Sequence, residues 1–346
     1  MNYTLNAFAL GTPSVFVVWS PFQVLCAIAA LSQLNIEEYL FLVYLPRGGA
    51  RNNQIICILN RFKIKYKSLK DVSSNKARLY YLIRSLLVRK TRYSRLFIGD
   101  FKEYLELYVG CGFVSKGSVV VYLDDGNQAI SLFKNRYVDN GYSYSGNPKI
   151  NLATRNLISI VKRMSFMHNF LTIYYNIPNP LYNIRKLNID CLSIATKVES
   201  TTCRDVFIIG TNMSGFCGPL NIPEEDFIKL LDLICKNIRR QYPLDTIYYI
   251  PHGRETKSYA ESICLKYEME FKRSNNIIEV EMLDIGCYPK AVYGFTSNAL
   301  YTLKSLFPFA YVENILLKGD KNNPFFMEYL EVSKYYEKAG IILHQF

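Results

Sequence analysis

The fold is indicated first by Val119-Val120-Val121-Tyr122-Leu123-Asp124-Asp125-Gly126-Asn127, an apolar run of high β propensity that ends in two carboxylates and a glycine. This pattern predicts a buried strand with both acids just past its carboxyl end, a tight turn at Gly126 and a helix after it. In open α/β sheets ligands bind at that edge. Because a neighbouring carboxylate and partial burial raise a carboxyl pKa, the pair suits a general base. The alternative is that the acids only cap the following helix.

Strand and helix patterns alternate on both sides of this stretch. Short apolar runs typical of strands occur at 14–19, 39–44, 95–99, 205–210, 246–250, 291–295 and 309–312. Segments with apolar residues at helical spacing lie at 24–31, 51–62, 78–88, 102–109, 223–242, 298–306 and 324–338. Regular alternation of this kind predicts parallel sheets covered by helices, which is an α/β fold.

The 346 residues are enough for two domains. We expect an N-terminal domain over residues 1–150, a linker and helical connection over 151–204, and a C-terminal domain over 205–346. Within the connection, residues 157–175 are basic and strongly apolar. Such a segment is either an interfacial helix on a membrane or a helix that packs on its own protein.

Composition restricts the function classes. The 41 Lys and Arg exceed the 29 Asp and Glu, for a formal net charge of +12. This excess suits a phosphate-bearing substrate, nucleic acid or an anionic membrane surface. The positive charges are spread along the chain without an arginine-rich block, which disfavours nucleic-acid binding. We find neither a signal peptide nor a long apolar membrane span, and expect a cytoplasmic protein.

The cysteine pattern argues against disulfide and zinc sites. The nine cysteines stand singly, without a CxxC pair, as expected for reduced thiols in a cytosolic protein. No acidic or histidine cluster has metal-ligand spacing beyond Asp124-Asp125, so we expect no metal. That pair could instead hold Mg²⁺ in a different nucleotide-sugar enzyme.

Polar groups follow several of the predicted strands. Ser20-Pro21 after the first strand is a good helix start, and the amides there could bind an anion or a sugar hydroxyl. In the second half three strand ends carry polar groups that would meet at one sheet edge and suit a phosphate. The candidate binding residues are Ser20, Gln23, Gly126, Gly210, Asn212, Arg254, Thr296 and Ser297, with His252 beside Arg254. Singly, each is also explained as a turn, a helix cap or a salt-bridged arginine.

The order of three of these motifs resembles that in bacterial sialyltransferases. Asp124-Asp125-Gly126 is similar to their two-acid-plus-glycine motif, His252 to their His-Pro motif, and Thr296-Ser297 to their paired Ser/Thr motif. The opening Trp19-Ser20-Pro21-Phe22-Gln23-Val24-Leu25 resembles the start of glycosyltransferase family 52 and of polysialyltransferase-like proteins. The motifs span roughly residues 15 to 300, and Gly253 stands where the family usually has proline.

This resemblance implies a GT-B fold, with two Rossmann-like domains facing across a cleft. The first would be the acceptor side and the second would bind the nucleotide sugar. The donor would be CMP-sialic acid, with inversion at the anomeric carbon and neither a metal nor a cofactor. Asp125 would be the general base, Asp124 would orient it or the acceptor, and His252 would support the departing phosphate together with Thr296 and Ser297.

The predicted function is therefore transfer of sialic acid to a surface glycan. The acceptor would be a lipooligosaccharide, O-antigen or capsule precursor, possibly lipid-linked, with the enzyme cytoplasmic or peripheral on the inner face of the plasma membrane. One alternative is a transferase that uses another CMP-linked keto-acid sugar or a different nucleotide sugar. A non-enzymatic alternative is a basic nucleic-acid-binding protein.

Overall fold

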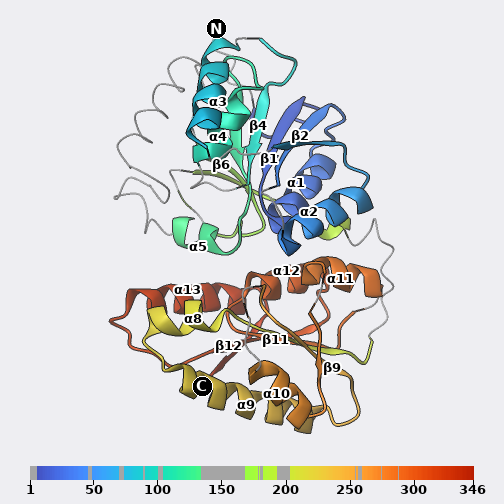
Figure 1. Cartoon of the computed structure of the whole chain (residues 1–346), viewed down its shortest axis with the longest axis vertical. Coiled ribbons are helices and arrows are strands. Elements are labelled where there is room, and N and C mark those ends of the chain that lie inside the picture. Colours follow the sequence, from blue (N-terminus) through green and yellow to red (C-terminus); the bar gives the residue numbers. More distant parts are fainter. Residues whose placement is uncertain are drawn as a thin grey trace. The chain divides into compact units, whose positions relative to one another are not determined.

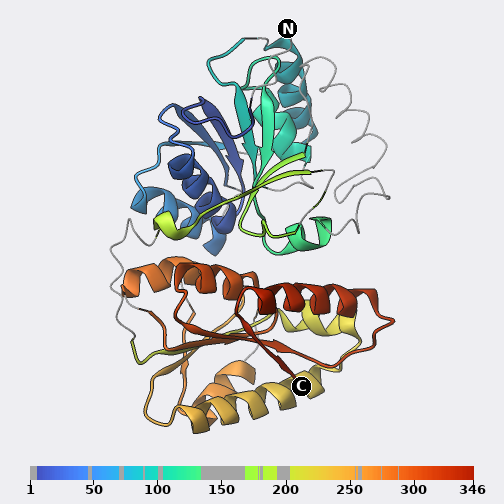
Figure 2. The same cartoon turned by 180° about the vertical axis from the view of Figure 1, so that it is seen from behind.

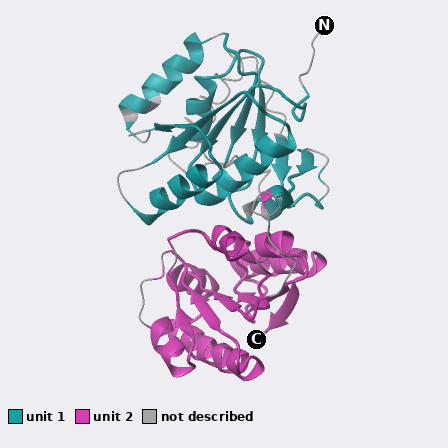
Figure 3. Ribbon diagram, turned by 90° about the vertical axis from the view of Figure 1, so that its right-hand side faces the viewer, with its two compact units in different colours: residues 1–191 teal, residues 192–346 magenta. Residues whose placement is uncertain are grey.

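The computed structural model divides the chain into two compact units, Met1–Cys191 (unit 1) and Leu192–Phe346 (unit 2), which are coloured separately in Figure 3. The structure describes residues 6–45, 49–69, 74–88, 90–99, 104–133, 168–177, 179, 182–192, 203–253, 255, 259–273, 275–286 and 288–346.

Unit 1 is built on a seven-stranded sheet in the order β3-β2-β1-β4-β5-β6-β7, and every pairing is parallel. The strands are β1 (Ser14–Val18), β2 (Tyr39–Tyr44), β3 (Tyr66–Leu69), β4 (Arg95–Ile98), β5 (Val119–Tyr122), β6 (His168–Thr172) and β7 (Tyr182–Lys186). Strands β1 and β4 are buried at every position, as expected for parallel strands covered on both faces.

Five described helices accompany this sheet. They are α1 (Pro21–Gln33), α2 (Ala50–Arg61), α3 (Asn75–Leu87), α4 (Tyr104–Cys111) and α5 (Gln128–Phe133). Helix α1 packs beside α2, and α3 beside α4 (Figure 1). The start of α1 follows from its sequence, because the Ser20 hydroxyl accepts a hydrogen bond from the Gln23 amide and Pro21 occupies the first helical position.

Unit 2 repeats the same arrangement with a six-stranded parallel sheet in the order β10-β9-β8-β11-β12-β13. Its strands are β8 (Val206–Ile209), β9 (Ile247–Ile250), β10 (Glu270–Phe271), β11 (Ala291–Gly294), β12 (Tyr311–Leu316) and β13 (Ile342–Gln345). Its helices are α8 (Met213–Leu220), α9 (Glu224–Gln241), α10 (Tyr259–Lys266), α11 (Ile278–Ile285), α12 (Asn298–Leu306) and α13 (Pro324–Lys338). Figures 1 and 2 show α9 and α10 on one face of the sheet and α11, α12 and α13 on the other.

Both sheets therefore have Rossmann-like strand order, and the predicted α/β fold with two Rossmann-like domains is confirmed. In each unit the first strand pairs with the second on one side. The fourth strand of the unit pairs with the first on its other side. The switch points lie between β1 and β4 in unit 1 and between β8 and β11 in unit 2. Ligands of such sheets bind outside the carboxyl ends of the strands at these points.

The predicted connection over residues 151–204 differs from the structure. Strands β6 and β7 belong to the unit 1 sheet, so the boundary predicted at residue 150 is too early. The helical interpretation of residues 157–175 is wrong over 168–172, which form β6 with Phe170 and Leu171 buried. An apolar run with few turn residues fits a buried strand as well as a helix. Residues 157–167 lie outside the described part of the chain.

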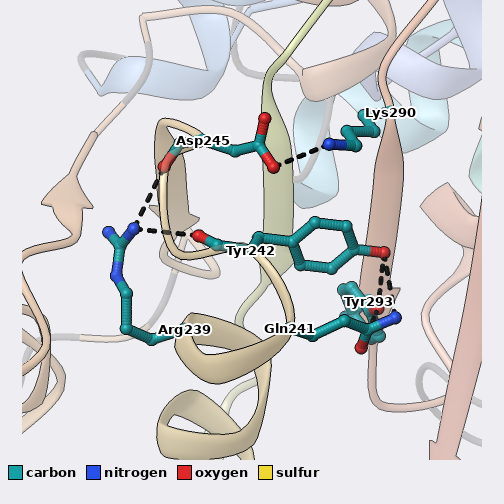
Figure 4. A network of polar contacts seen from close by, with 6 residues as sticks. All are labelled: Arg239, Gln241, Tyr242, Asp245, Lys290 and Tyr293. Atoms are coloured by element: carbon teal, nitrogen blue, oxygen red, sulfur yellow. Dashed lines mark hydrogen bonds and ion pairs between the residues drawn. The ribbon is translucent and has the colours of Figure 1, made fainter.

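At the amino-terminal edge of the unit 2 sheet, opposite the carboxyl ends of its strands, side chains form a network of polar contacts (Figure 4). At the end of α9, Arg239 donates from Nη1 to the carbonyl oxygens of Tyr242 and Asp245, each at 3.1 Å. The hydroxyls of Tyr242 and Tyr293 lie 3.1 Å apart, and Lys290 donates to the Asp245 carboxylate at 2.7 Å. These contacts join α9 to the starts of β9 and β11, and they give the amino-terminal edge of the sheet a structural role.

Candidate active site

In unit 1 the predicted residues gather at the carboxyl ends of β1, β4 and β5, which are neighbours in the sheet. Ser20 follows β1, and its hydroxyl donates a hydrogen bond to Asp125 Oδ1 at 3.0 Å, across 105 positions of sequence. Asp125 follows β5, two strands away from β1. The contact therefore crosses the end of β4.

Gly99, at the end of β4, leaves room for the side chain of Gln23. A Cβ at Gly99 would overlap the side chain of Gln23, which is only 2% exposed. Gln23 Oε1 in turn accepts hydrogen bonds from the amides of Trp19 at 2.6 Å and Ser20 at 3.1 Å. Gln23 was predicted to bind substrate; in the structure it is buried, and its side-chain carbonyl oxygen fixes the turn that carries Ser20.

Asp124 is the buried member of the acidic pair, with 1% of its surface exposed. Thr172 donates to Oδ1 at 2.6 Å and the amide of Ile173 donates to Oδ2 at 2.8 Å, both from the end of β6. Burial raises the pKa of Asp124 to about 7, with a smaller increase from the charge of Asp125, although both hydrogen bonds oppose this shift. Asp124 therefore changes charge near neutral pH.

Asp125 is the more accessible carboxylate, half-buried where Asp124 is buried. The turn after it requires a glycine, because Gly126 has φ +88°, and a Cβ there would meet no other atom within 4 Å. A partly exposed carboxylate beside a buried one that ionises near neutrality can accept a proton from a bound hydroxyl. The structure thus brings Ser20, Gln23, Asp124, Asp125 and Gly126 together at one edge of the unit 1 sheet.

In unit 2 the predicted phosphate-binding groups follow three adjacent strands. Gly210 ends β8, His252 follows β9, and Thr296 follows β11, in the sheet order β9-β8-β11. Parallel strands end at the same edge, so these residues share one side of unit 2. The side chain of His252 is exposed. Arg254, the other cationic candidate, lies outside the described residues.

The loop after β9 is organised by Glu255, a buried residue that the sequence analysis did not single out. Its carboxylate accepts hydrogen bonds from Tyr249 at 2.8 Å, from Tyr259 at 2.6 Å and from the His252 amide at 3.0 Å. A Cβ at Gly210 would lie 2.5 Å from Glu255 Oε2, so only glycine fits beside this carboxylate. The only sequence signal is the spacing of three residues between His252 and an acid that can bond its amide.

The loop after β11 places the buried Thr296 and the half-buried Ser297 at the start of α12, with the Thr296 hydroxyl 3.4 Å from that of Ser333. Thr296 has φ +47°, an uncommon conformation for a β-branched residue, and its amide donates to Asn314 Oδ1 at 2.6 Å. Ser297 caps α12 by accepting from the Ala299 amide at 3.3 Å. Asn314 itself is held by Ser333, to which its Nδ2 donates at 2.8 Å. The strained backbone at Thr296 is thus supported by two buried polar side chains.

Asn212 and Glu279 are two further polar residues of unit 2 with close contacts. Asn212 precedes α8, and a Cβ at Gly215 would overlap its side chain, so the first turn of that helix is tightly packed. Glu279 of α11 is buried and accepts a hydrogen bond from Thr302 of α12 at 2.6 Å, and burial raises its pKa. The sequence analysis did not single out Glu279, since nothing in a helical pattern distinguishes a buried glutamate from an exposed one. Among the described residues, no group of three or more His, Cys, Asp or Glu side chains could hold a metal ion.

Comparison with known proteins gives a likeness in fold. No sequence-family description and no curated protein matches the chain. The crystal structure of the 2,6-sialyltransferase of Photobacterium sp. JT-ISH-224, in complex with CMP and lactose, matches with a TM-score of 0.50 and 12% identity, over 96% of this chain and 78% of that one. The GT-B domain of the Photobacterium damselae sialyltransferase matches with a TM-score of 0.47 and 13% identity, over 97% of this chain and 100% of that one. The fold is thus α/β of the GT-B type.

Proposed function

We propose that this protein is an inverting glycosyltransferase that moves sialic acid from CMP-sialic acid to a hydroxyl of a bacterial glycan. The proposal rests chiefly on the acidic pair after β5, in which Asp124 is buried and Asp125 is accessible and bonded to Ser20. A fold shared with a sialyltransferase that was crystallised with CMP and lactose supports it, as does the matching order of three short motifs.

Unit 1 would carry out the proton transfer. The acceptor hydroxyl attacks the anomeric carbon of the sialyl group, the bond from that carbon to the CMP phosphate breaks, and the hydroxyl proton passes to Asp125. The Ser20 hydroxyl holds Asp125 Oδ1 and so orients the carboxylate. Asp124, fixed by Thr172 and the Ile173 amide, keeps the turn in place and adds negative charge beside the base as its own carboxyl ionises.

Unit 2 would bind the departing CMP. Charge develops on the phosphate as the bond breaks, and preformed donors stabilise that charge. His252 is the exposed side chain at the end of β9, and Thr296 with Ser297 lies at the start of α12, where the helix dipole favours an anion. Gly210 and Asn212 complete the proposed phosphate contacts, and Arg254 is proposed from sequence alone. A monophosphate needs only a few such hydrogen bonds, so the proposed reaction uses no metal or cofactor.

We further propose membership of glycosyltransferase family 52 or its polysialyltransferase-like relatives, with a lipooligosaccharide, O-antigen or capsule precursor as acceptor. The net charge of +12 suits an anionic donor and a protein placed at the inner face of the plasma membrane. Among the described residues, no helix has the length and apolar character needed to cross a membrane.

Calorimetric titration tests this proposal. We expect CMP to bind selectively over UMP, UDP and GDP, with unchanged affinity in EDTA. Preference for another nucleotide, or binding that depends strictly on a metal, would overturn the assignment of CMP-sialic acid as donor. It would favour the alternative of a transferase that uses a different nucleotide sugar. Salt-sensitive binding of oligonucleotides that CMP does not displace would support the nucleic-acid-binding alternative instead.

A further inference from the structure

Helix α3 has its apolar side facing solvent. Four large apolar residues along it are exposed: Leu79 by 57%, Tyr80 by 56%, Ile83 by 46% and Leu87 by 73%. At 100° per residue these positions fall on one side of the helix. Ser85, on the opposite side, is fully buried at 0%. A helix packed on a globular domain usually turns such a group of large apolar side chains toward the core.

This cluster has no counterpart among the other described residues. Their exposed large apolar side chains occur one to an element or loop, at Leu10, Tyr66, Leu233, Leu244, Leu265, Ile285, Phe309, Phe325 and Ile342. Single exposed apolar residues are ordinary on protein surfaces, whereas a contiguous group marks a surface that binds something. The apolar face of α3 (Leu79, Tyr80, Ile83 and Leu87) is therefore the strongest unexplained surface of unit 1.

The charge around this face is positive. No acidic residue occurs in the sequence from Ser74 to Gly99, which contains seven lysines and arginines. Lys76 is exposed one turn before Leu79 and Tyr80, and Lys90 is exposed just past the end of the helix. Arg84 is directed elsewhere, because it donates to the Gly112 carbonyl at 2.9 Å and lies 4.3 Å from the Phe113 ring centroid.

We propose that the apolar face of α3 docks unit 1 on an anionic phospholipid bilayer. A helix of 13 residues is too short to span a membrane, but it can lie in the plane of the interface with its apolar side among the acyl chains. Lysines at both ends of the face would then meet lipid phosphates. This docking surface is not the segment at 157–175 that the sequence suggested as an interfacial helix. The docking proposal holds whichever nucleotide sugar the protein uses.

The alternative occupants are a second copy of the chain or a partner protein. A second copy would bring its own Lys76 and Lys90 against the same basic rim, and like charges oppose such an interface. A bilayer that contains anionic lipid supplies both the apolar depth and the negative charge that this face lacks.

Vesicle sedimentation tests the proposal. The full chain should sediment with phosphatidylglycerol-containing vesicles at low salt and much less with pure phosphatidylcholine. The triple variant Leu79→Ser/Ile83→Ser/Leu87→Ser should need about tenfold more lipid for half-maximal binding, because it loses the inserted side chains. Lys76→Glu should weaken binding to the anionic vesicles and remove part of its salt dependence.

Leu244→Ser is the matched control, since Leu244 is 90% exposed outside α3. It should bind vesicles as the unchanged protein does. Melting temperature and circular dichroism establish that each variant is folded. The proposal is overturned if the folded triple variant sediments like the unchanged protein. It is equally overturned if neither protein binds anionic vesicles, or if ultracentrifugation shows a dimer that the triple variant dissociates.

Discussion

The sheet edges that carry the candidate residues have the same topology in the two units but different polar groups. In unit 1 the edge beyond β1, β4 and β5 presents two carboxylates, one buried and one accessible. In unit 2 the edge beyond β9, β8 and β11 carries the exposed His252, the half-buried Ser297 and the start of α12, while the hydroxyl of the buried Thr296 lies 3.4 Å from that of Ser333. In the proposed reaction the first edge would accept a proton, whereas the second would donate hydrogen bonds to an anion.

Each edge also has a glycine that makes room for a buried polar side chain. Gly99 accommodates Gln23 in unit 1, and Gly210 accommodates Glu255 in unit 2. In both cases the buried side chain then bonds backbone amides of the loop that bears candidate residues. In both units, a buried polar side chain beside a glycine thus orders the loop that carries candidate residues.

The largest expected effect follows from removing the proposed base. Asp125→Asn should lower transfer about 10³-fold, because an amide cannot accept the hydroxyl proton, and should leave CMP affinity nearly unchanged. Steady-state kinetics and calorimetry on the same preparation measure both quantities. Asp226→Asn on α9, whose side chain is 59% exposed, is the control. Loss of CMP binding together with activity would mean that the two edges do not divide their tasks.

The packing of the second edge predicts the next effect. Gly210→Ala should lower the free energy of unfolding by about 2–3 kcal/mol, because the added methyl would collide with Glu255 Oε2 and the Tyr249 hydroxyl. Chemical denaturation measures this change. Gly218→Ala is the matched control, since a Cβ there meets no atom within 4 Å. Equal stability of the two variants would contradict the proposed role of Glu255.

The buried acid of the first edge predicts a pH effect on stability. The folded-state pKa of Asp124, about 7, lies above its unfolded value of 3.8, so the folded protein binds the proton more tightly. This carboxyl therefore costs stability progressively as pH rises from about 4 to about 7, and fully above that range. Between about pH 5 and about pH 8, the stability difference between Asp124→Asn and the unchanged protein should shift by about 3 kcal/mol in favour of the variant.

Denaturation curves at several pH values measure this shift. The substitution itself has a constant cost, because the amide NH2 group takes the place of one carboxylate oxygen and cannot accept the hydrogen bond that Thr172 or the Ile173 amide donates there. Only the change of this stability difference with pH therefore reports the ionisation of Asp124. A difference that stays constant across the range would mean that Asp124 is ionised throughout.

The smallest expected effect concerns nucleotide affinity. His252→Ala should weaken CMP binding about tenfold, the loss expected for one charge-assisted hydrogen bond, and should lower transfer with it. His344→Ala on β13, a half-exposed histidine paired with Glu313, is the control and should bind CMP normally. Unchanged affinity in His252→Ala would remove this residue from the donor site.

Sequence patterns predicted those parts of the fold in which polarity and structure agree. The strand before Asp124 and Asp125 is a continuous apolar run, and the start of α1 has both a serine cap and a proline, so both were predicted. Strand β3 was missed because its first three residues are exposed, and β6 was interpreted as helix because its apolar run has no distinctive period.

The site was predictable only where residues lie directly after strands. Ser20 and Asp125 each occupy such a position, yet their contact depends on the sheet order β1-β4-β5, which local patterns do not contain. The burial of Glu255 and the positive φ of Thr296 arise from tertiary packing and have no local signal. The outward apolar face of α3 was also missed, since a helical pattern does not reveal which side meets the core.

The central claim is tested most directly by following sugar transfer with NMR. The protein would be incubated in EDTA with CMP-sialic acid and lactose, and in parallel with UDP- and GDP-sugars. The account predicts release of CMP and an α-linked sialoside from the β-linked donor, with the other nucleotide sugars unchanged and Asp125→Asn inactive. Turnover of a UDP- or GDP-sugar while CMP-sialic acid remains intact, or a product of retained configuration, would contradict it.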